Sequence, residues 1–276
     1  MTVKAEATLD DLLTDAAKAG QPMTRRVLTA WIQLGLLDHP ARRGKGRAKG
    51  SHPATVTPDQ RQLFALLLRH RSTVKRLSTL AALPVTIWVY WGDDYVPLRQ
   101  AKRALGTCLG KARHPAKHYA QRVAQDVVDQ LAHPDAPPTA KRKLLRLLTE
   151  AAYEGRITYR ADLRATLRAV FDPHAENRRI GPAGIGIDAD AWLNAVLLRE
   201  QGTLAFLRGR INDDMFQEAR HELRQSLTDY QLLQAGFASS LTETGTQDAS
   251  DLVNSACPNL LMVIGSLQRR QQENHV

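Results

Sequence analysis

The stretch Met23-Thr-Arg-Arg-Val-Leu-Thr-Ala-Trp-Ile-Gln-Leu-Gly-Leu-Leu37 determines the expected fold of the first quarter of the chain. Its apolar residues recur at the spacing of one helical face: Val27, Leu28, Trp31 and Leu34. Thr24 is a preferred N-cap residue, and Gly35 supplies the left-handed conformation that ends many helices. The stretch therefore predicts a short amphipathic helix with two arginines at its start.

A first helix is expected just before this stretch. Thr8 is followed three residues later by Asp11, which is the pattern of a capping box. Gly20 and Pro22 then mark the end of that helix. Two short helices joined by a tight turn that contains glycine form a helix-turn-helix unit.

On the other side of the stretch, the helical pattern disappears between Leu36 and Thr57. The segment 41–52 holds three glycines and five basic residues and reads as the exposed tip of a two-stranded hairpin. Thr57, followed by Pro58 and by Gln60 at the third helical position, predicts the next helix start. The order helix, helix, hairpin, helix is the outline of a winged helix.

These residues resemble the recognition helix and exit of MerR-type winged-helix DNA-binding proteins. That family has a small hydroxyl residue, an Arg, a Leu, an aromatic residue and a Gly-Leu-Leu turn ahead of an Arg-bearing wing. The matching positions are Thr24, Arg26, Leu28, Trp31 and Gly35-Leu36-Leu37. The resemblance covers residues 8–70 and implies that the helix enters the DNA major groove while the wing contacts the backbone or the minor groove.

The charge distribution points to the same class of partner. The chain has a net charge of +10, and its first 115 residues hold 19 Lys and Arg against 8 Asp and Glu. Residues 116–276 hold 19 against 20, whereas residues 24–76 alone hold 12 against 2. Such asymmetry favours a polyanionic partner, nucleic acid before membrane.

The residues expected to contact double-stranded DNA form three groups. The helix contributes Thr24, Arg25, Arg26, Thr29 and Trp31. The wing contributes Arg42, Arg43, Lys45, Arg47, Lys49, Ser51 and His52. A second helix contributes Arg99, Lys102 and Arg103. Arg can bind guanine O6 and N7 in a bidentate manner, and cations on a flexible loop can follow phosphates.

Two of these predictions have a competing interpretation. Trp31 lies in the apolar stripe and is favoured as a core residue, although the family resemblance also brings the aromatic residue near a phosphate. The segment 96–105 reads first as an amphipathic helix with a wet basic face, and alternatively as a second DNA-contact element.

The expected fold class is mainly α, with an N-terminal winged helix-turn-helix that has a small β-hairpin wing, followed by a larger all-helical region. Further helices are predicted at 73–82, 97–112, 117–131, 139–152, 159–171, 189–207, 213–234 and 249–271, with Pro258 kinking or splitting the last one. The predicted domains are a DNA-binding domain at 1–78, a helical connector at 79–135 and a helical C-terminal domain at 136–276. The C-terminal domain is expected to serve oligomerisation, effector binding or partner binding.

Catalytic, cofactor and metal-binding patterns are not recognised, so no enzyme activity, no cofactor and no metal site are expected. The chain has two cysteines and no apolar signal segment, so we expect a cytoplasmic, nucleoid-associated protein without a membrane partner. The predicted function is a sequence-specific DNA-binding transcriptional regulator, most simply a repressor, and a homodimer is possible. Two alternatives stay open: an excisionase-like or architectural DNA-bending protein, and an effector-binding or enzymatic protein with a DNA tether.

Overall fold

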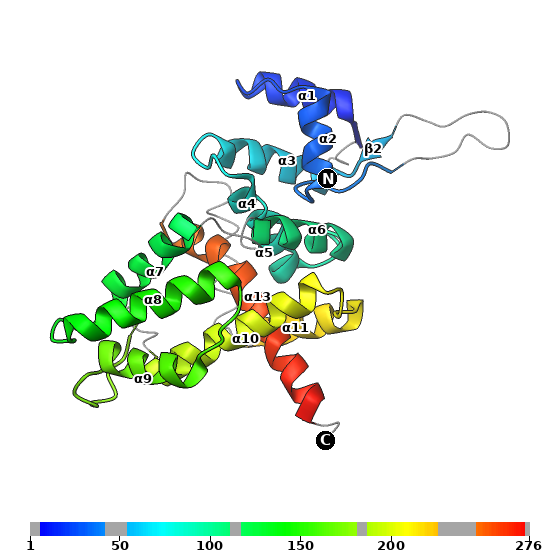
Figure 1. Ribbon diagram of the computed structural model, residues 1–276. Helices are drawn as coiled ribbons and strands as arrows, with labels where there is room; N and C mark the ends of the chain where they lie inside the picture. The colour runs from blue at the N-terminus through cyan, green and yellow to red at the C-terminus, as the bar shows by residue number, and fades with distance from the viewer. Residues whose placement is uncertain (1–5, 42–53, 111–116, 181–186, 226–246, 274–276) are drawn as a thin grey trace. The chain divides into compact units, whose positions relative to one another are not determined.

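The chain is mainly helical and has one small antiparallel sheet, as the computed structural model shows (Figure 1). The structure describes residues 6–41, 54–110, 117–180, 187–225 and 247–273, and the side chains of the last range from residue 255 onwards. Within these residues, no helix combines the length and the apolar character that crossing a membrane requires.

The helices divide into two compact units. Unit 1 comprises Met1–Gly110 and Asn212–Leu260, and unit 2 comprises Lys111–Ile211 and Leu261–Val276. The predicted domain limits after residues 78 and 135 do not coincide with this division, because later helices complete the core that the N-terminal helices begin.

The first two helices of unit 1 form as the sequence predicts. Helix α1 (Leu9–Lys18) begins with the capping box of Thr8 and Asp11, whose side chains each accept a hydrogen bond from the other's backbone N–H. Helix α2 (Arg25–Gln33) begins at Thr24, whose side chain accepts a hydrogen bond from the Val27 backbone N–H. Both helices are followed by a glycine with positive φ, +71° at Gly20 and +79° at Gly35.

A short sheet closes the N-terminal helices. Strand β1 (Ala7–Thr8) pairs with strand β2 (Thr55–Val56) in antiparallel register. Ala41 forms a bridge to Thr55 on the other side, with N–H···O distances of 2.7 and 3.0 Å. Of the predicted hairpin, the described residues show this single bridge, whereas β2 takes β1 as its strand partner; the segment 42–53 lies outside the described residues.

Helix α3 (Pro58–Arg71) begins at Thr57 as predicted, and the Thr57 side chain accepts from the Gln60 backbone N–H at 3.2 Å. The apolar face of α3 packs on α2, where Trp31 meets Phe64 edge to face with ring centroids 6.0 Å apart. The Gln60 side chain does not complete a capping box. It turns into the core, where it joins buried polar groups.

The helix predicted at 73–82 is wrong. The structure has a single turn, α4 (Leu77–Leu80), followed by α5 (Ala82–Trp91). Every residue of α5 up to Tyr90 is buried, so its sequence shows no amphipathic period. Pro84 is the third residue of α5, where the backbone N–H needs no partner within the helix, and the proline is tolerated.

Two later helices pack around α5 within unit 1. Helix α6 (Leu98–Leu109) contacts α5 along its length, and α11 (Asp213–Gln225) places Phe216 edge to face against Trp88, 6.2 Å between centroids. Arg220 of α11 donates from Nε to the carbonyl oxygens of Trp88 and Val89 at 2.8 and 3.0 Å. These contacts explain why the segment after residue 212 belongs to unit 1.

Among the described residues, unit 2 contains four helices and the end of a fifth, close to their predicted positions. They are α7 (Lys117–Leu131), α8 (Pro138–Glu154), α9 (Arg160–Phe171), α10 (Ala189–Leu207) and the C-terminal part of α13 (Gln247–Glu273). The core contains Leu144, Leu167 and Phe171, and Phe171 packs edge to face on Trp192.

Helix α13 is continuous through Pro258, so the predicted split does not occur. In unit 2 it crosses α10 with direct backbone contact. A Cβ atom at Gly202 would lie 1.9 Å from the Leu261 carbonyl oxygen, and one at Gly265 would lie 1.9 Å from the Leu198 carbonyl oxygen. Only glycine permits this approach.

Candidate nucleic-acid interface

Helix α2 separates a buried face from a polar face. Leu28, Trp31 and Ile32 are 0–5% exposed and fix the helix on α1 and α3. The polar face is exposed at Thr24, Arg25, Arg26, Thr29 and Gln33. The helix therefore presents to solvent four of the residues that the sequence assigned to DNA contact, near its N-terminus.

Arg25 and Arg26 differ in their engagement. The Arg25 guanidinium lies 2.9 Å from Asp10 Oδ1, and the two side chains are 62% and 76% exposed. An ion pair this exposed contributes no more than about 1 kcal/mol, so a phosphate can replace Asp10 at small cost.

Arg26 makes no hydrogen bond and no ion pair with any residue that the structure describes, and its side chain is exposed. The Thr29 hydroxyl donates to the Arg25 carbonyl oxygen at 2.9 Å, one turn back along α2. All five N–H donors of Arg26 are consequently available to a ligand, beside a threonine whose orientation is fixed.

Trp31 belongs to the core. Its residue is 1% exposed, its ring packs on Phe64, and the Arg71 guanidinium lies 5.4 Å from its centroid. This burial supports the core interpretation of Trp31 and leaves the indole no surface with which to meet a phosphate.

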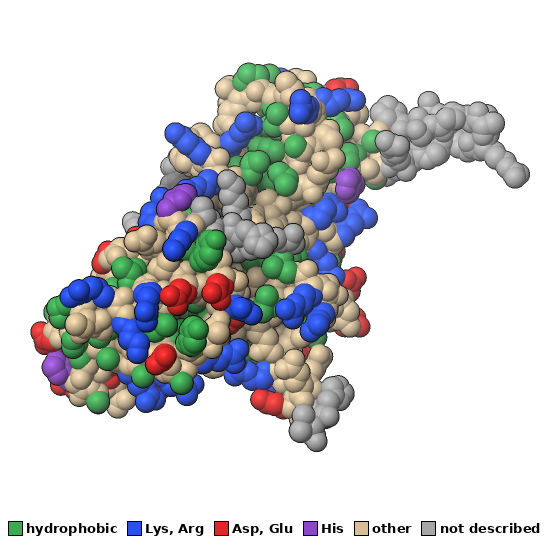
Figure 2. Space-filling model, viewed as in Figure 1, with side chains coloured by type: hydrophobic (Ala, Val, Ile, Leu, Met, Phe, Trp, Pro, Cys, Tyr) green, Lys and Arg blue, Asp and Glu red, His purple; other side chains and the backbone are tan. Residues whose placement is uncertain are grey.

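The predicted wing contacts lie outside the described residues. These are Arg42, Arg43, Lys45, Arg47, Lys49, Ser51 and His52. Ala41 before the segment and β2 after it are described, and His39, two residues before Ala41, is exposed. On the face drawn in Figure 2, Lys and Arg side chains are more prominent than Asp and Glu over the N-terminal helices.

The cations of α6 are engaged within unit 1. Arg99 donates to the Asp38 carboxylate from Nε and Nη2, with distances between 2.5 and 3.2 Å. Arg103 donates to the same carboxylate from Nη2 at 3.0 Å. Asp38 is 6% exposed, and we refer to these three residues as the Asp38 cluster.

Lys102 is engaged as well. Its ammonium forms an ion pair with Asp213 at the start of α11 and lies 4.6 Å from the Phe216 ring centroid. The three α6 cations expected to contact DNA therefore join the parts of unit 1 to one another. Arg99 keeps 67% of its side chain exposed, whereas Lys102 and Arg103 are about three-quarters covered.

A buried polar network supports the Asp38 cluster and was not foreseen from the sequence. Gln60 Oε1 accepts from the Asp38 backbone N–H at 2.8 Å, and Gln60 Nε2 donates to Gln100 Oε1 at 2.7 Å. Gln100 Nε2 donates to the Leu36 carbonyl oxygen at 3.1 Å. Sequence spacing gives no signal for it, because the partners lie 22 to 64 residues apart.

The charge state of Asp38 follows from its surroundings. Burial raises the pKa of the carboxyl, and hydrogen bonds from Arg99, the His39 backbone N–H and Arg103 outweigh burial. The pKa of Asp38 therefore lies below its ordinary value, and the carboxylate stays ionised at neutral pH.

The exit of α2 is held tightly against α6. A Cβ atom at Gly35 would lie 2.4 Å from the Ala104 backbone nitrogen, and the Thr107 hydroxyl donates to the Leu34 carbonyl oxygen at 2.7 Å. The C-terminal end of α2 is thus anchored on α6, and this contact fixes the orientation of the α2 polar face within unit 1.

The chain was compared with family models, with curated proteins and with solved structures, and it matches none of them.

Proposed function

We propose that this protein is a sequence-specific DNA-binding transcriptional regulator that reads the major groove with the polar face of α2. One observation carries the proposal: Arg26 is an exposed arginine without a partner among the described residues, on a helix whose other face is fixed in a core. A helix fits the major groove, and an arginine near its N-terminus is placed as base-reading residues are in helix-turn-helix proteins.

The neighbouring residues extend this function. Arg25 can exchange its exposed partner Asp10 for a phosphate, which positions the helix without reading sequence. Thr29 lies one turn further along the same polar face; because its hydroxyl donates to the Arg25 carbonyl, it offers its oxygen as an acceptor and its methyl group to base edges. The basic segment 42–49 supplies the nonspecific part of the affinity through counterion release. Repression would follow from occlusion of a promoter.

Selection of bound duplexes from a random pool, followed by salt titration on the selected and on random DNA, tests the proposal. We expect a defined motif with a large affinity gap over random DNA. Enrichment of no motif, with equal salt slopes on both DNAs, would leave a nonspecific or architectural binder and overturn the regulator.

Substitutions at Arg26 test its readout role. Arg26→Ala is expected to cost about 1–3 kcal/mol on the selected motif and to relax specificity there. Arg26→Lys keeps the charge and loses the bidentate geometry, so it should restore affinity for random DNA but not specificity. Arg160→Ala is the matched control, because Arg160 is an exposed arginine at the start of α9 in unit 2. Equal losses on specific and random DNA in Arg26→Ala would contradict the role.

A substitution in the basic segment separates phosphate contact from base reading. Lys45→Ala is expected to weaken binding to all sequences alike and to reduce the salt slope by about one unit. A change in the selected motif itself would show that Lys45 contacts bases instead.

A further inference from the structure

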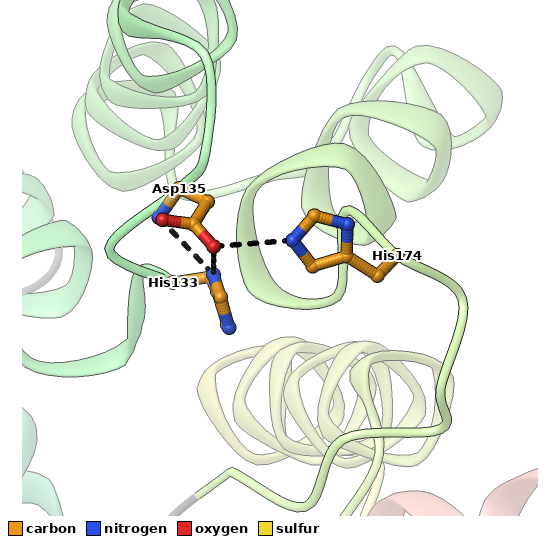
Figure 3. Close-up of side chains that lie close together, drawn as sticks. All are labelled: His133, Asp135 and His174. Carbon is orange, nitrogen blue, oxygen red and sulfur yellow. Dashed lines mark hydrogen bonds and ion pairs between the residues drawn. The ribbon is translucent and has the colours of Figure 1, made fainter.

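Three side chains with potential metal-ligand atoms lie together in unit 2, on two loops that are separated along the chain by α8 and α9. His133 and Asp135 belong to the loop between α7 and α8, and His174 follows α9. Figure 3 shows one carboxylate oxygen of Asp135 facing a nitrogen atom of each imidazole ring. Asp135 Oδ2 is 3.2 Å from His174 Nε2 and 3.8 Å from His133 Nδ1.

A backbone hydrogen bond and the Arg178 side chain hold the two loops in place without help from the three metal-binding candidates. The His133 backbone N–H donates to the Val170 carbonyl oxygen at 2.9 Å, which joins the first loop to the end of α9. Arg178 Nη1 donates to the carbonyl oxygens of Leu131 and Phe171 at 3.3 and 3.2 Å. The chain thus brings the three groups together before any ligand binds, which lowers the entropy cost of binding.

We propose that His133, Asp135 and His174 bind one divalent transition-metal ion of the zinc class. Zinc prefers imidazole nitrogen and carboxylate oxygen at about 2.0–2.2 Å, so atoms of a tetrahedral site lie about 3.3–3.5 Å apart. The observed 3.2 and 3.8 Å lie on either side of that separation, and one ligand atom from each residue lies within 4.8 Å of the others. The remaining coordination position falls to water.

The orientation of the His133 ring suits this role. Its Nδ1 accepts a hydrogen bond from the Asp135 backbone N–H at 3.1 Å, so the nitrogen lone pair faces the loop that carries Asp135. Binding a metal at Nδ1 exchanges that single hydrogen bond for a coordinate bond. The side chains of Asp135 and His174 are 67% and 51% exposed, which gives the ion a path from solvent.

The bound ion would cross-link the loop after α9 to the loop between α7 and α8. The turn after His174 has two non-glycine residues with positive φ, Ala175 at 56° and Asn177 at 54°. Such conformations each cost on the order of 1 kcal/mol or more and persist where the surroundings impose them. A metal at this point would add a bond to a turn whose backbone is already constrained.

Titration of the metal-free full-length protein, without a histidine tag, with Co²⁺ tests the proposal. We expect one equivalent to bind with the visible d–d absorption of a nitrogen- and oxygen-ligated ion. His174→Ala and Asp135→Asn should weaken binding at least about 10–100-fold, since even outer residues of metal sites have effects of this size. Zn²⁺ should also raise the melting temperature of the native protein and not that of His174→Ala.

Two control variants separate this site from other ligands. His118→Ala removes an exposed histidine elsewhere on α7 and should leave the affinity for Co²⁺ unchanged. Cys108→Ser removes a thiol whose Sγ lies 2.9 Å from Cys257 Sγ in unit 1, and it should also have no effect. The proposal is wrong if the native protein does not bind Co²⁺, or if binding survives in His174→Ala. Loss in Cys108→Ser with sulfur-to-metal charge-transfer bands would assign the ion to the thiols and equally overturn it.

Discussion

Helices α2 and α6 have the same amphipathic, basic pattern in the sequence, but their basic side chains differ in how many partners they have in the structure. Each is amphipathic and has basic residues near its start, and each was expected to contact DNA. On α2, Arg26 has no partner among the described residues, and Arg25 has only the exposed Asp10. On α6, all three cations are paired, two of them with Asp38.

The two helices differ in how exposed to solvent the acidic partner of their arginines is. Asp10 is 76% exposed in its side chain and competes with water and salt, whereas the Asp38 side chain is 8% exposed and receives two guanidinium groups. An exposed pair is readily exchanged for a phosphate, and a pair with a buried carboxylate is not. A basic helix is therefore a candidate DNA reader only after its internal partners are known.

The largest expected effect is at the contact between the two helices. Gly35→Ala combines positive φ with a Cβ atom 2.4 Å from the Ala104 backbone nitrogen, so unit 1 should lose about 3 kcal/mol or more of unfolding free energy. Gly20→Ala is the control, because Gly20 has positive φ with open space around it and should lose only about 1–2 kcal/mol. Hydrogen exchange read by mass spectrometry measures the stability of unit 1 separately from that of unit 2. Equal losses of stability in Gly35→Ala and Gly20→Ala would contradict the close contact at Gly35.

The next effect concerns the Asp38 cluster. Asp38→Ala leaves Arg99 and Arg103 without their carboxylate, and unit 1 should lose about 2–3 kcal/mol of unfolding free energy. This is below the usual cost of breaking a buried pair, because Arg99 is two-thirds exposed. Urea denaturation measures the loss, and Asp10→Ala, which removes the exposed partner of Arg25, should change stability by less than about 1 kcal/mol.

Alanine substitutions on α2 and on α6 should differ by about 1–3 kcal/mol in their effect on the free energy of DNA binding. Arg26→Ala removes the α2 arginine that has no partner among the described residues and should weaken binding to the selected motif by that amount. Arg99→Ala removes the most exposed cation of α6 and should leave the affinity for the same duplex within about twofold once the variant is shown to be folded. If anisotropy titration finds Arg99→Ala as weak as Arg26→Ala, α6 contacts DNA despite its ion pairs.

Acid provides the smallest and most specific test of the same cluster. Because the folded-state pKa of Asp38 is lowered, its contribution to stability is complete above the unfolded pKa of about 3.9 and is lost as the pH falls through the folded value. Asp38→Asn should therefore show a shallower loss of stability below about pH 4 than the native chain. Parallel pH profiles of the two proteins would show that the carboxylate charge does not stabilise the fold.

Much of the local structure could be predicted from the sequence because it depends on neighbours in the chain. Thr8, Thr24 and Thr57 cap the helices that the sequence places after them, and Gly20 and Gly35 take the positive φ that ends helices. These features follow from unpaired backbone groups at helix ends and from the steric freedom of glycine. Helix α5 was missed because a helix buried on all sides shows no periodic pattern.

The tertiary structure alone decided which charged and polar groups meet. Asp38 lies 61 and 65 residues from the arginines that it binds, and Asp135 lies 39 residues from His174. The predicted helices leave Asp135 and His174 in the gaps after residues 131 and 171, but the proximity of these two side chains could not be predicted. Sequence by itself determined the helices, their caps and the excess of positive charge. Packing determined which of those charges are neutralised, because Coulomb attraction and hydrogen bonding act over a few ångströms in space regardless of separation along the chain.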